Sequence, residues 1–220
     1  MENKKKITLS RFIACLIILS LVVVGGLALR DAMINPTKRY AMAIEFLNKG
    51  EYKQAERAFL IVNEDGNAEQ QLGAAYYLAQ MYDKGAETFS ANGPKAALFY
   101  EKAAKAGLVE AQYRLALMYD TGDKIPENRS KALVWMNEAA KQGMPQALYV
   151  LGVWIERGYV GDKIPMGKVV ALYEAAAVQG HKQAMTSLVN IYGSGFGEFP
   201  HNIEKSVYWK NHLEELNTKK

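Results

Sequence analysis

The chain has 220 residues, half of them apolar, and a formal net charge of +4. This length suits a single domain, or one domain with a short additional segment. The charge is concentrated at the ends: residues 1–36 carry +3 and Lys219 and Lys220 add +2, so residues 37–218 sum to −1. Nucleic-acid binding requires clustered positive charge, and the near-neutral body of the chain excludes nucleic acid as a partner.

The N-terminal segment predicts a membrane anchor. Residues 1–11 are basic, and Phe12 to Leu29 is a run of 18 residues without a charge, about the minimum for a helix that crosses the bilayer. The positive-inside rule then predicts a cytoplasmic N-terminus, a transmembrane signal-anchor at 12–29 and an exported remainder. The predicted location is the bacterial inner membrane, with a periplasmic repeat domain. A cleaved signal peptide is the alternative, although Leu27-Ala28-Leu29-Arg30 is a poor cleavage site.

The next residues predict a linker and a first helix pair. Residues 30–37 contain Pro36 and are interpreted as the linker. Apolar residues recur at helical spacing within 38–70, on both sides of a turn at Lys49-Gly50-Glu51. The segment Gly50 to Ala55 resembles the turn between the two helices of a tetratricopeptide repeat.

From residue 71 to residue 220 the chain repeats itself. Four copies cover 74–107, 111–143, 147–180 and 184–216, at intervals of 36 or 37 residues. Each copy predicts a first helix that ends at glycine, a loop of about nine residues, and a second helix that begins at lysine. Such pairs cannot bury their apolar faces alone, but stacked copies share one core. The loop isoleucines Ile125 and Ile164 are expected to pack beneath the helices.

The motif A-x-x-x-L-G/A-x-x-Y-x-x-G, followed after the loop by K-A-x-x-W/Y-x-x-A-A-x-x-G, resembles the Sel1-like repeat, a relative of the tetratricopeptide repeat. The copies at 74–107 and 111–143 match best, whereas the third has Ile155 in place of the tyrosine and the last lacks the Ala-Ala-x-x-Gly end. The predicted fold class is all-α: a right-handed α-solenoid of about five helix-turn-helix repeats after one N-terminal transmembrane helix. The resemblance is specific for the fold and says little about function.

The first helices predict a binding groove on the concave face of the solenoid. Their third, seventh and tenth positions share one helical face. The third position is tyrosine in three copies, and the tenth position holds Asp83, Asp120 and Glu156, which we call the acidic row. The predicted groove residues are Tyr76, Gln80, Asp83, Tyr113, Leu117, Asp120, Tyr149, Val153, Glu156 and Asn190. Two alternatives remain open: the tyrosines pack between neighbouring helices, and the acids are solvated or offset the lysines that begin the second helices.

The sequence offers no catalytic constellation. The three histidines, His181, His201 and His212, are scattered, and no zinc, P-loop, Rossmann or nucleophile motif is present. We therefore expect no cofactor, no metal, no small-molecule substrate and no enzymatic activity. An enzyme would require an active site assembled from side chains such as Glu198 and His201.

The predicted function is that of a membrane-anchored scaffold or adaptor, held in the inner membrane by Phe12 to Leu29, whose exported solenoid binds a protein partner. The resemblance also implies an alternative. Some exported Sel1-like proteins are immunity proteins that neutralise secreted antibacterial phospholipase-type effectors in the periplasm. No residue in the sequence distinguishes the two functions.

Overall fold

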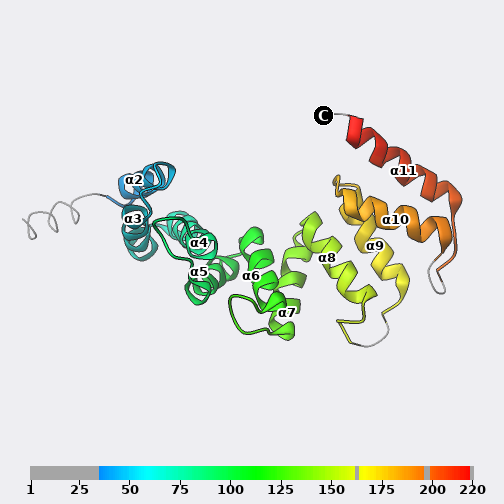
Figure 1. Cartoon of the computed structure of the whole chain (residues 1–220), viewed down its shortest axis with the longest axis horizontal. Helices are drawn as coiled ribbons and strands as arrows, with labels where there is room; N and C mark the ends of the chain where they lie inside the picture. Colours follow the sequence, from blue (N-terminus) through cyan, green and yellow to red (C-terminus); the bar gives the residue numbers. More distant parts are fainter. Residues whose placement is uncertain (1–34, 162–163, 196–198, 219–220) are drawn as a thin grey trace, which may run out of the picture. The chain divides into compact units, whose positions relative to one another are not determined.

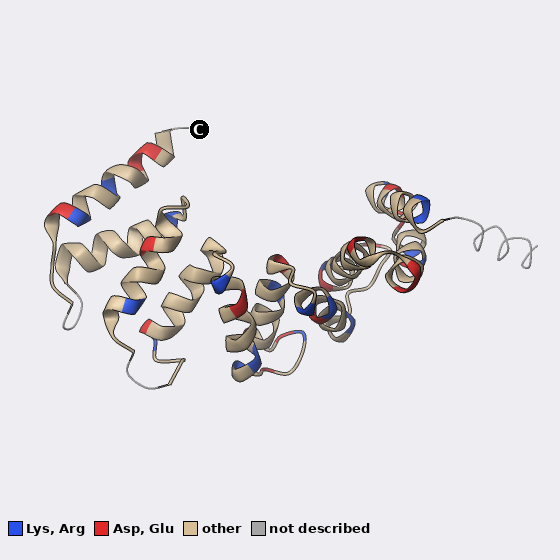
Figure 2. Cartoon of the chain, turned by 180° about the vertical axis from the view of Figure 1, so that it is seen from behind, with Lys and Arg blue, Asp and Glu red and all other residues tan. Residues whose placement is uncertain are grey.

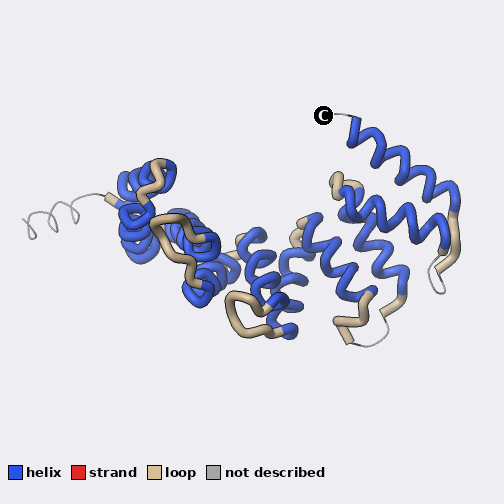
Figure 3. The backbone as a smooth tube through the Cα atoms, viewed as in Figure 1, coloured by secondary structure: helices blue, strands red, loops and turns tan. Residues whose placement is uncertain are grey.

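The computed structural model describes residues 35–161, 164–195 and 199–218. Within these ranges the secondary structure is helical, with a single isolated β-bridge between Ala86 and Phe89 (Figures 1 and 3). The helices are α2 (Pro36–Asn48), α3 (Tyr52–Asp65), α4 (Ala68–Lys84), α5 (Gly93–Lys105), α6 (Val109–Thr121), α7 (Arg129–Lys141), α8 (Pro145–Glu156), α9 (Met166–Ala177), α10 (Lys182–Ser194) and α11 (Ile203–Thr218). The all-α solenoid prediction is confirmed.

The chain divides into two compact units, Met1–Ala74 and Ala75–Lys220, with the division inside α4. In the first unit α2 and α3 form a helix pair. Asn35 caps α2 by accepting a 2.9 Å hydrogen bond from the backbone N–H of Lys38. Helix α2 therefore begins at Pro36, inside the predicted linker. Tyr40 packs edge-on against the fully buried Phe59, with 6.0 Å between ring centroids.

The second unit holds the repeats. From α5 to α11, each helix packs on the next helix along the chain, the pattern of a solenoid. In the repeat at 147–180 a second-helix side chain packs directly on the sixth position of the first helix, which is Gly152. A Cβ added to Gly152 would lie 2.5 Å from the ring of Tyr173, so only glycine admits that tyrosine without rearrangement.

Three of the four loops between first and second helices are closed in the same way. Asn92, Asn128 and Asn202 cap the second helices by accepting a hydrogen bond from the backbone N–H three residues later, at 2.9–3.0 Å. Their own N–H groups donate to the carbonyl oxygens of Tyr82, Tyr119 and Tyr192 at 2.7–2.8 Å. Ile125 is 8% exposed, as expected for a structural loop residue, whereas Ile164 is only partly buried.

Glutamine side chains join successive repeats, a feature that the sequence analysis missed. The amide nitrogen of Gln142 donates to the carbonyl oxygen of Gly107 at 3.2 Å, and that of Gln179 donates to Gly143 at 2.9 Å. Both glycines have positive φ, +92° and +82°, as predicted for residues that end the second helices.

The predicted membrane localisation is corrected. In the ranges that the structure describes, no helix is long and apolar enough to cross a bilayer. The longest of them, α4, has 17 residues and includes Glu69, Asp83 and Lys84; a spanning helix needs about 20 mainly apolar residues. This finding contradicts the prediction of a single-pass inner-membrane protein with a periplasmic repeat domain. The segment assigned to the anchor, residues 12–29, lies outside the described residues, as do residues 1–11.

Candidate protein-binding surface

The ten predicted groove residues lie on the first helices of the repeats, and we call them the first-helix surface. Helix α4 carries Tyr76, Gln80 and Asp83; α6 carries Tyr113, Leu117 and Asp120; α8 carries Tyr149, Val153 and Glu156; and α10 carries Asn190. Glu156 and Asn190 are exposed and the other eight residues are partly buried. All ten therefore combine contact with the protein and access to solvent.

The tyrosines of this surface pack against second helices, which is one of the alternatives considered above. The ring centroid of Tyr76 lies 6.2 Å from that of Tyr100, and that of Tyr149 lies 5.5 Å from that of Tyr173. Burial raises the pKa of Tyr76 and Tyr113 above the ordinary value. Because each ring is still partly exposed, one side of it remains available for contact.

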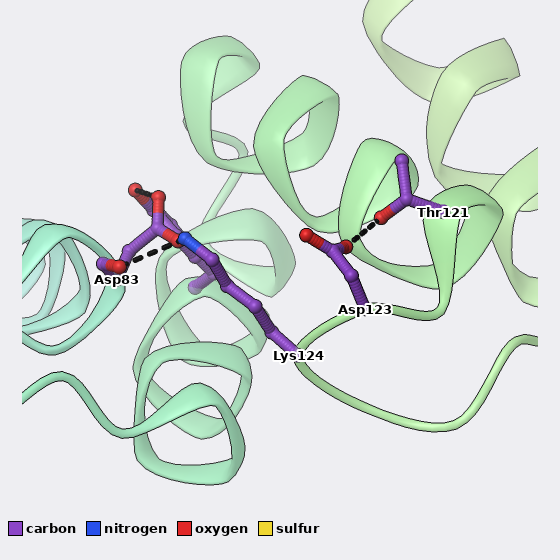
Figure 4. A network of polar contacts seen from close by, with 5 residues as sticks. Asp83, Thr121, Asp123 and Lys124 are labelled. Carbon is purple, nitrogen blue, oxygen red and sulfur yellow. Dashed lines mark hydrogen bonds and ion pairs between the residues drawn. The ribbon is translucent and has the colours of Figure 1, made fainter.

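Two acids of the surface are engaged by buried tyrosines. The hydroxyl of Tyr100 donates to Asp83 at 3.4 Å, and that of Tyr173 donates to Glu156 at 2.6 Å. Burial first, and then the neighbouring carboxylate, raise the pKa of both tyrosines, so these hydroxyls stay protonated as donors. Asp83 also forms a 2.5 Å ion pair with Lys124 from the loop after α6 (Figure 4).

The lysines predicted to begin three second helices lie in the first turn of α5, α7 and α11, two residues after the start of each helix. They contact tyrosines and not the acids of the acidic row. Their Nζ atoms lie over tyrosine rings, at 4.8 to 5.1 Å from the centroids, within the range of a cation–π contact. The pairs are Lys95 with Tyr82, Lys131 with Tyr119, and Lys205 with Tyr192. For these three lysines the structure shows contacts with tyrosine rings and no ion pair with the acidic row.

Asp120 differs from the other two acids. The position equivalent to Tyr100 and Tyr173 is occupied by Met136, which has no donor. Among the described residues no side chain donates a hydrogen bond to the carboxylate of Asp120. Burial raises its pKa, Arg129 opposes the shift, and Glu127 adds to it.

The structure brings Glu156 and Asn190 into one cavity of about 200 Å³ between α8 and α10. The other lining residues are Ser187, Ile191, Ser194 and Gly195. Sequence reasoning missed the serines, although Ser187, Asn190 and Ser194 follow one another at helical spacing on α10. The cavity combines a carboxylate, an amide and two hydroxyls with one apolar side chain, a set that suits the polar groups of a peptide.

The charges of the described helices do not form a single-sign face. Figure 2 shows lysine and arginine interspersed with aspartate and glutamate along the chain. Within the described ranges no group of three or more His, Cys, Asp or Glu residues could hold a metal ion. His201 is exposed in the loop before α11, and Glu198 lies outside the described residues.

Comparison with known proteins identifies the repeats. The Sel1 repeat model matches residues 73–108, 109–144 and 183–209, which is a little under half of the chain. The match omits the third copy, in which Ile155 replaces the tyrosine of the motif. No curated protein sequence matches the chain.

Solved structures share the fold. A protective antigen of uropathogenic Escherichia coli with an SLR fold is 24% identical, with a TM-score of 0.72, over 82% of this chain and 38% of that chain. This chain thus spans well under half of that relative's length. A Sel1 repeat protein from Oxalobacter formigenes is 23% identical, with a TM-score of 0.67, over 80% of this chain and 69% of that chain. At these identities the likeness concerns the fold alone.

An immunity protein from Pseudomonas aeruginosa aligns over 86% of each chain, but at 16% identity and a TM-score of 0.43. That likeness is too low to carry an argument about function.

The repeat matches and the structural likenesses agree with the helix pairs described above. The chain therefore contains Sel1 repeats and folds as a Sel1-like α-solenoid.

Proposed function

We propose that the protein is a non-enzymatic scaffold or adaptor whose first-helix surface binds a segment of a partner protein. Sel1-like solenoids suit this task, because stacked repeats present an extended surface that no single helix pair offers. The observation that carries the proposal is the cavity of about 200 Å³ that contains Glu156 and Asn190, two residues of that surface.

The chemistry of the surface supports binding of an extended peptide. Asn190 offers both a donor and an acceptor beside the apolar side chain of Ile191, and a peptide backbone presents the complementary groups. The half-buried rings of Tyr113 and Tyr149 offer large contact areas and lose little conformational entropy on binding. Recognition would then combine hydrogen bonds in the cavity with apolar contact along α6 and α8.

Photo-crosslinking in living cells tests the proposal. A photoreactive residue at Asn190, and separately at Tyr113, should capture the same partner, because both positions lie on the surface. Leu98 on α5 is 62% exposed and outside this surface, so it is the matched control position. Absence of adducts at both test positions, or the same adducts at Leu98, would contradict the proposal.

The identity of the captured protein separates the two functions considered from the sequence. Several subunits of one complex would support a scaffold, and a single secreted phospholipase would support an immunity function. No observation on the described residues favours the immunity function, so the scaffold is the proposal.

A further inference from the structure

The acidic row contains two engaged carboxylates and one that is free to take a cation. Asp83 accepts from Tyr100 and Lys124, and Glu156 accepts from Tyr173. Among the described residues, none forms a hydrogen bond or an ion pair with the carboxylate of Asp120. A partly buried carboxylate that has no hydrogen-bond donor can gain from a new charged partner.

Asp120 lies at a small notch between neighbouring repeats. The notch is lined by Asp120 at the end of α6, by Arg129, Ala132 and Leu133 of α7, and by Trp154 and Tyr159 at and after the end of α8. Trp154 is almost buried, whereas Tyr159 is 46% exposed. An acid beside an exposed aromatic ring is a combination that binds a cationic side chain, through charge and through the face of the ring.

The chain already places a guanidinium at this notch. The Cζ atom of Arg129 lies 5.1 Å from the centroid of the Tyr159 ring, and its charge opposes the rise that burial causes in the pKa of Asp120. Its ion pair is with Glu127, at 2.9 Å, and not with Asp120. With Arg129 in this place the notch has a free volume of only about 10 Å³, room for about one water molecule at most.

The contacts that hold Arg129 are weak ones. Its side chain is 64% exposed and that of Glu127 is 50% exposed, and exposed ion pairs contribute little because solvent screens them. A cation–π contact at an exposed ring is also modest. A partner's arginine, held in addition by contacts along the rest of the surface, can therefore displace Arg129.

We propose that Asp120 and the Tyr159 ring form the anchor site for an arginine side chain of the partner, and that Arg129 occupies this site in the free protein. The inference rests on the proposed function and names the chemistry that the first-helix surface selects. It also makes the three acids unequal: Asp120 selects an arginine, whereas the carboxylates of Asp83 and Glu156 already accept hydrogen bonds from tyrosines of their own repeats.

Peptide selection on the full chain tests this. A phage-displayed library of random 12-residue peptides is selected on the wild-type protein, and the dissociation constants of the enriched peptides are measured by fluorescence anisotropy. We expect an arginine at a shared position. Asp120→Asn, or citrulline in place of that arginine, should weaken binding at least tenfold. The two changes combined should cost little more than either alone, because they remove the same contact.

Two further variants separate the anchor from general charge effects. Arg129→Ala should tighten binding several-fold, because it removes the competing guanidinium and its opposing charge. Glu138→Gln removes one negative charge from α7, where Glu138 pairs with Lys141, and should change the dissociation constant less than twofold. Thermal melts of each variant establish that folding is intact.

The outcomes distinguish failure of the anchor from failure of the surface. Enriched peptides without a shared arginine, additive losses for Asp120→Asn and citrulline, or no loss at all would overturn the anchor. In that case, loss of binding in the double variant Glu156→Gln, Asn190→Ala would show that the peptides still bind the first-helix surface, without an arginine anchor at Asp120. Peptides insensitive to all of these changes, or no enrichment of any peptide, would overturn both.

Discussion

The repeat at 111–143 and the repeat at 147–180 solve the same packing problem with different polar contacts. In the first, Asn128 caps α7 and Lys131 lies over the ring of Tyr119. In the second, Pro165 stands at the cap position without a side-chain hydrogen bond, and Ile155 replaces the tyrosine. Both repeats nevertheless form two helices, α6 and α7 in the first and α8 and α9 in the second. The comparison teaches that the apolar core defines a repeat, whereas the polar contacts at the loop adjust its stability.

The core explains why the polar contacts are dispensable. Ala139 on α7 and Ala176 on α9 occupy equivalent positions, and both are fully buried in one continuous apolar cluster. Burial of apolar area is the main stabilising contribution, and each cap or cation–π contact contributes about 1 kcal/mol or less. Substitutions in the core, at the helix caps and at the start of α10 test this ranking.

A charge in the shared core should unfold either repeat. Ala139→Asp and Ala176→Asp each bury a carboxylate with no partner, and we expect losses of about 3–5 kcal/mol in the free energy of unfolding. Urea unfolding followed by circular dichroism measures this. Ala171→Asp on the exposed side of α9 is the control. A large difference between the two core variants would mean that the repeats do not share one core.

The close contact of Gly152 with Tyr173 is particular to the repeat at 147–180. Gly152→Ala places a methyl group 2.5 Å from the tyrosine ring, so we expect a loss of about 1–3 kcal/mol from overpacking. Adding Tyr173→Met should recover part of the loss, because the equivalent position in the preceding repeat is Met136, which belongs to the same apolar cluster as Ala116. Thermal unfolding of the single and double variants tests this, and additive losses would contradict the contact.

The helix caps should differ between the two repeats. Asn128→Ala removes the side-chain acceptor for the N–H of Lys131, and we expect a loss of about 1 kcal/mol. Pro165→Ala removes no such hydrogen bond and should change the free energy of unfolding by less than half as much. Equal losses in urea unfolding would show that the cap does not distinguish the repeats.

The smallest expected effect is a pH dependence of the stability, which arises from His181 at the start of α10. The Nδ1 atom of His181 accepts from the N–H of Ala184 at 3.2 Å, and the ring packs on Tyr149. Burial lowers the pKa of His181 below the ordinary 6.5, so the folded state binds its proton less readily than the unfolded state does. This contribution is complete above pH 6.5 and is lost as the pH falls below it.

His181→Asn keeps a cap acceptor but removes the titrating group. The variant should therefore lose less stability than the wild type between pH 7 and pH 5. Thermal unfolding at both pH values measures the difference. An identical pH dependence in the two proteins would mean that protonation of His181 does not affect folding.

Much of the candidate site could be located from spacing alone. The ten residues of the first-helix surface follow from a period of 36–37 residues and from helical geometry, and all of them reach solvent in the structure. The notch at Asp120 could not be found this way. It involves Arg129, Trp154 and Tyr159 from other helices and loops, and their approach depends on how successive repeats pack.

Spacing in the sequence was enough to predict the repeat and its Sel1-like motif, because glycine stops, apolar spacing and small residues act within or between neighbouring turns. The starts of the helices were predicted less well: α2 begins at Pro36, inside the expected linker, and the second helices begin before their lysines. Only the tertiary structure decided which acid is free. Asp83 and Glu156 meet tyrosines 17 residues away, on the second helix of their own pair, whereas Asp120 faces no such donor. That difference arises from contacts between packed helices, and local propensity does not determine it.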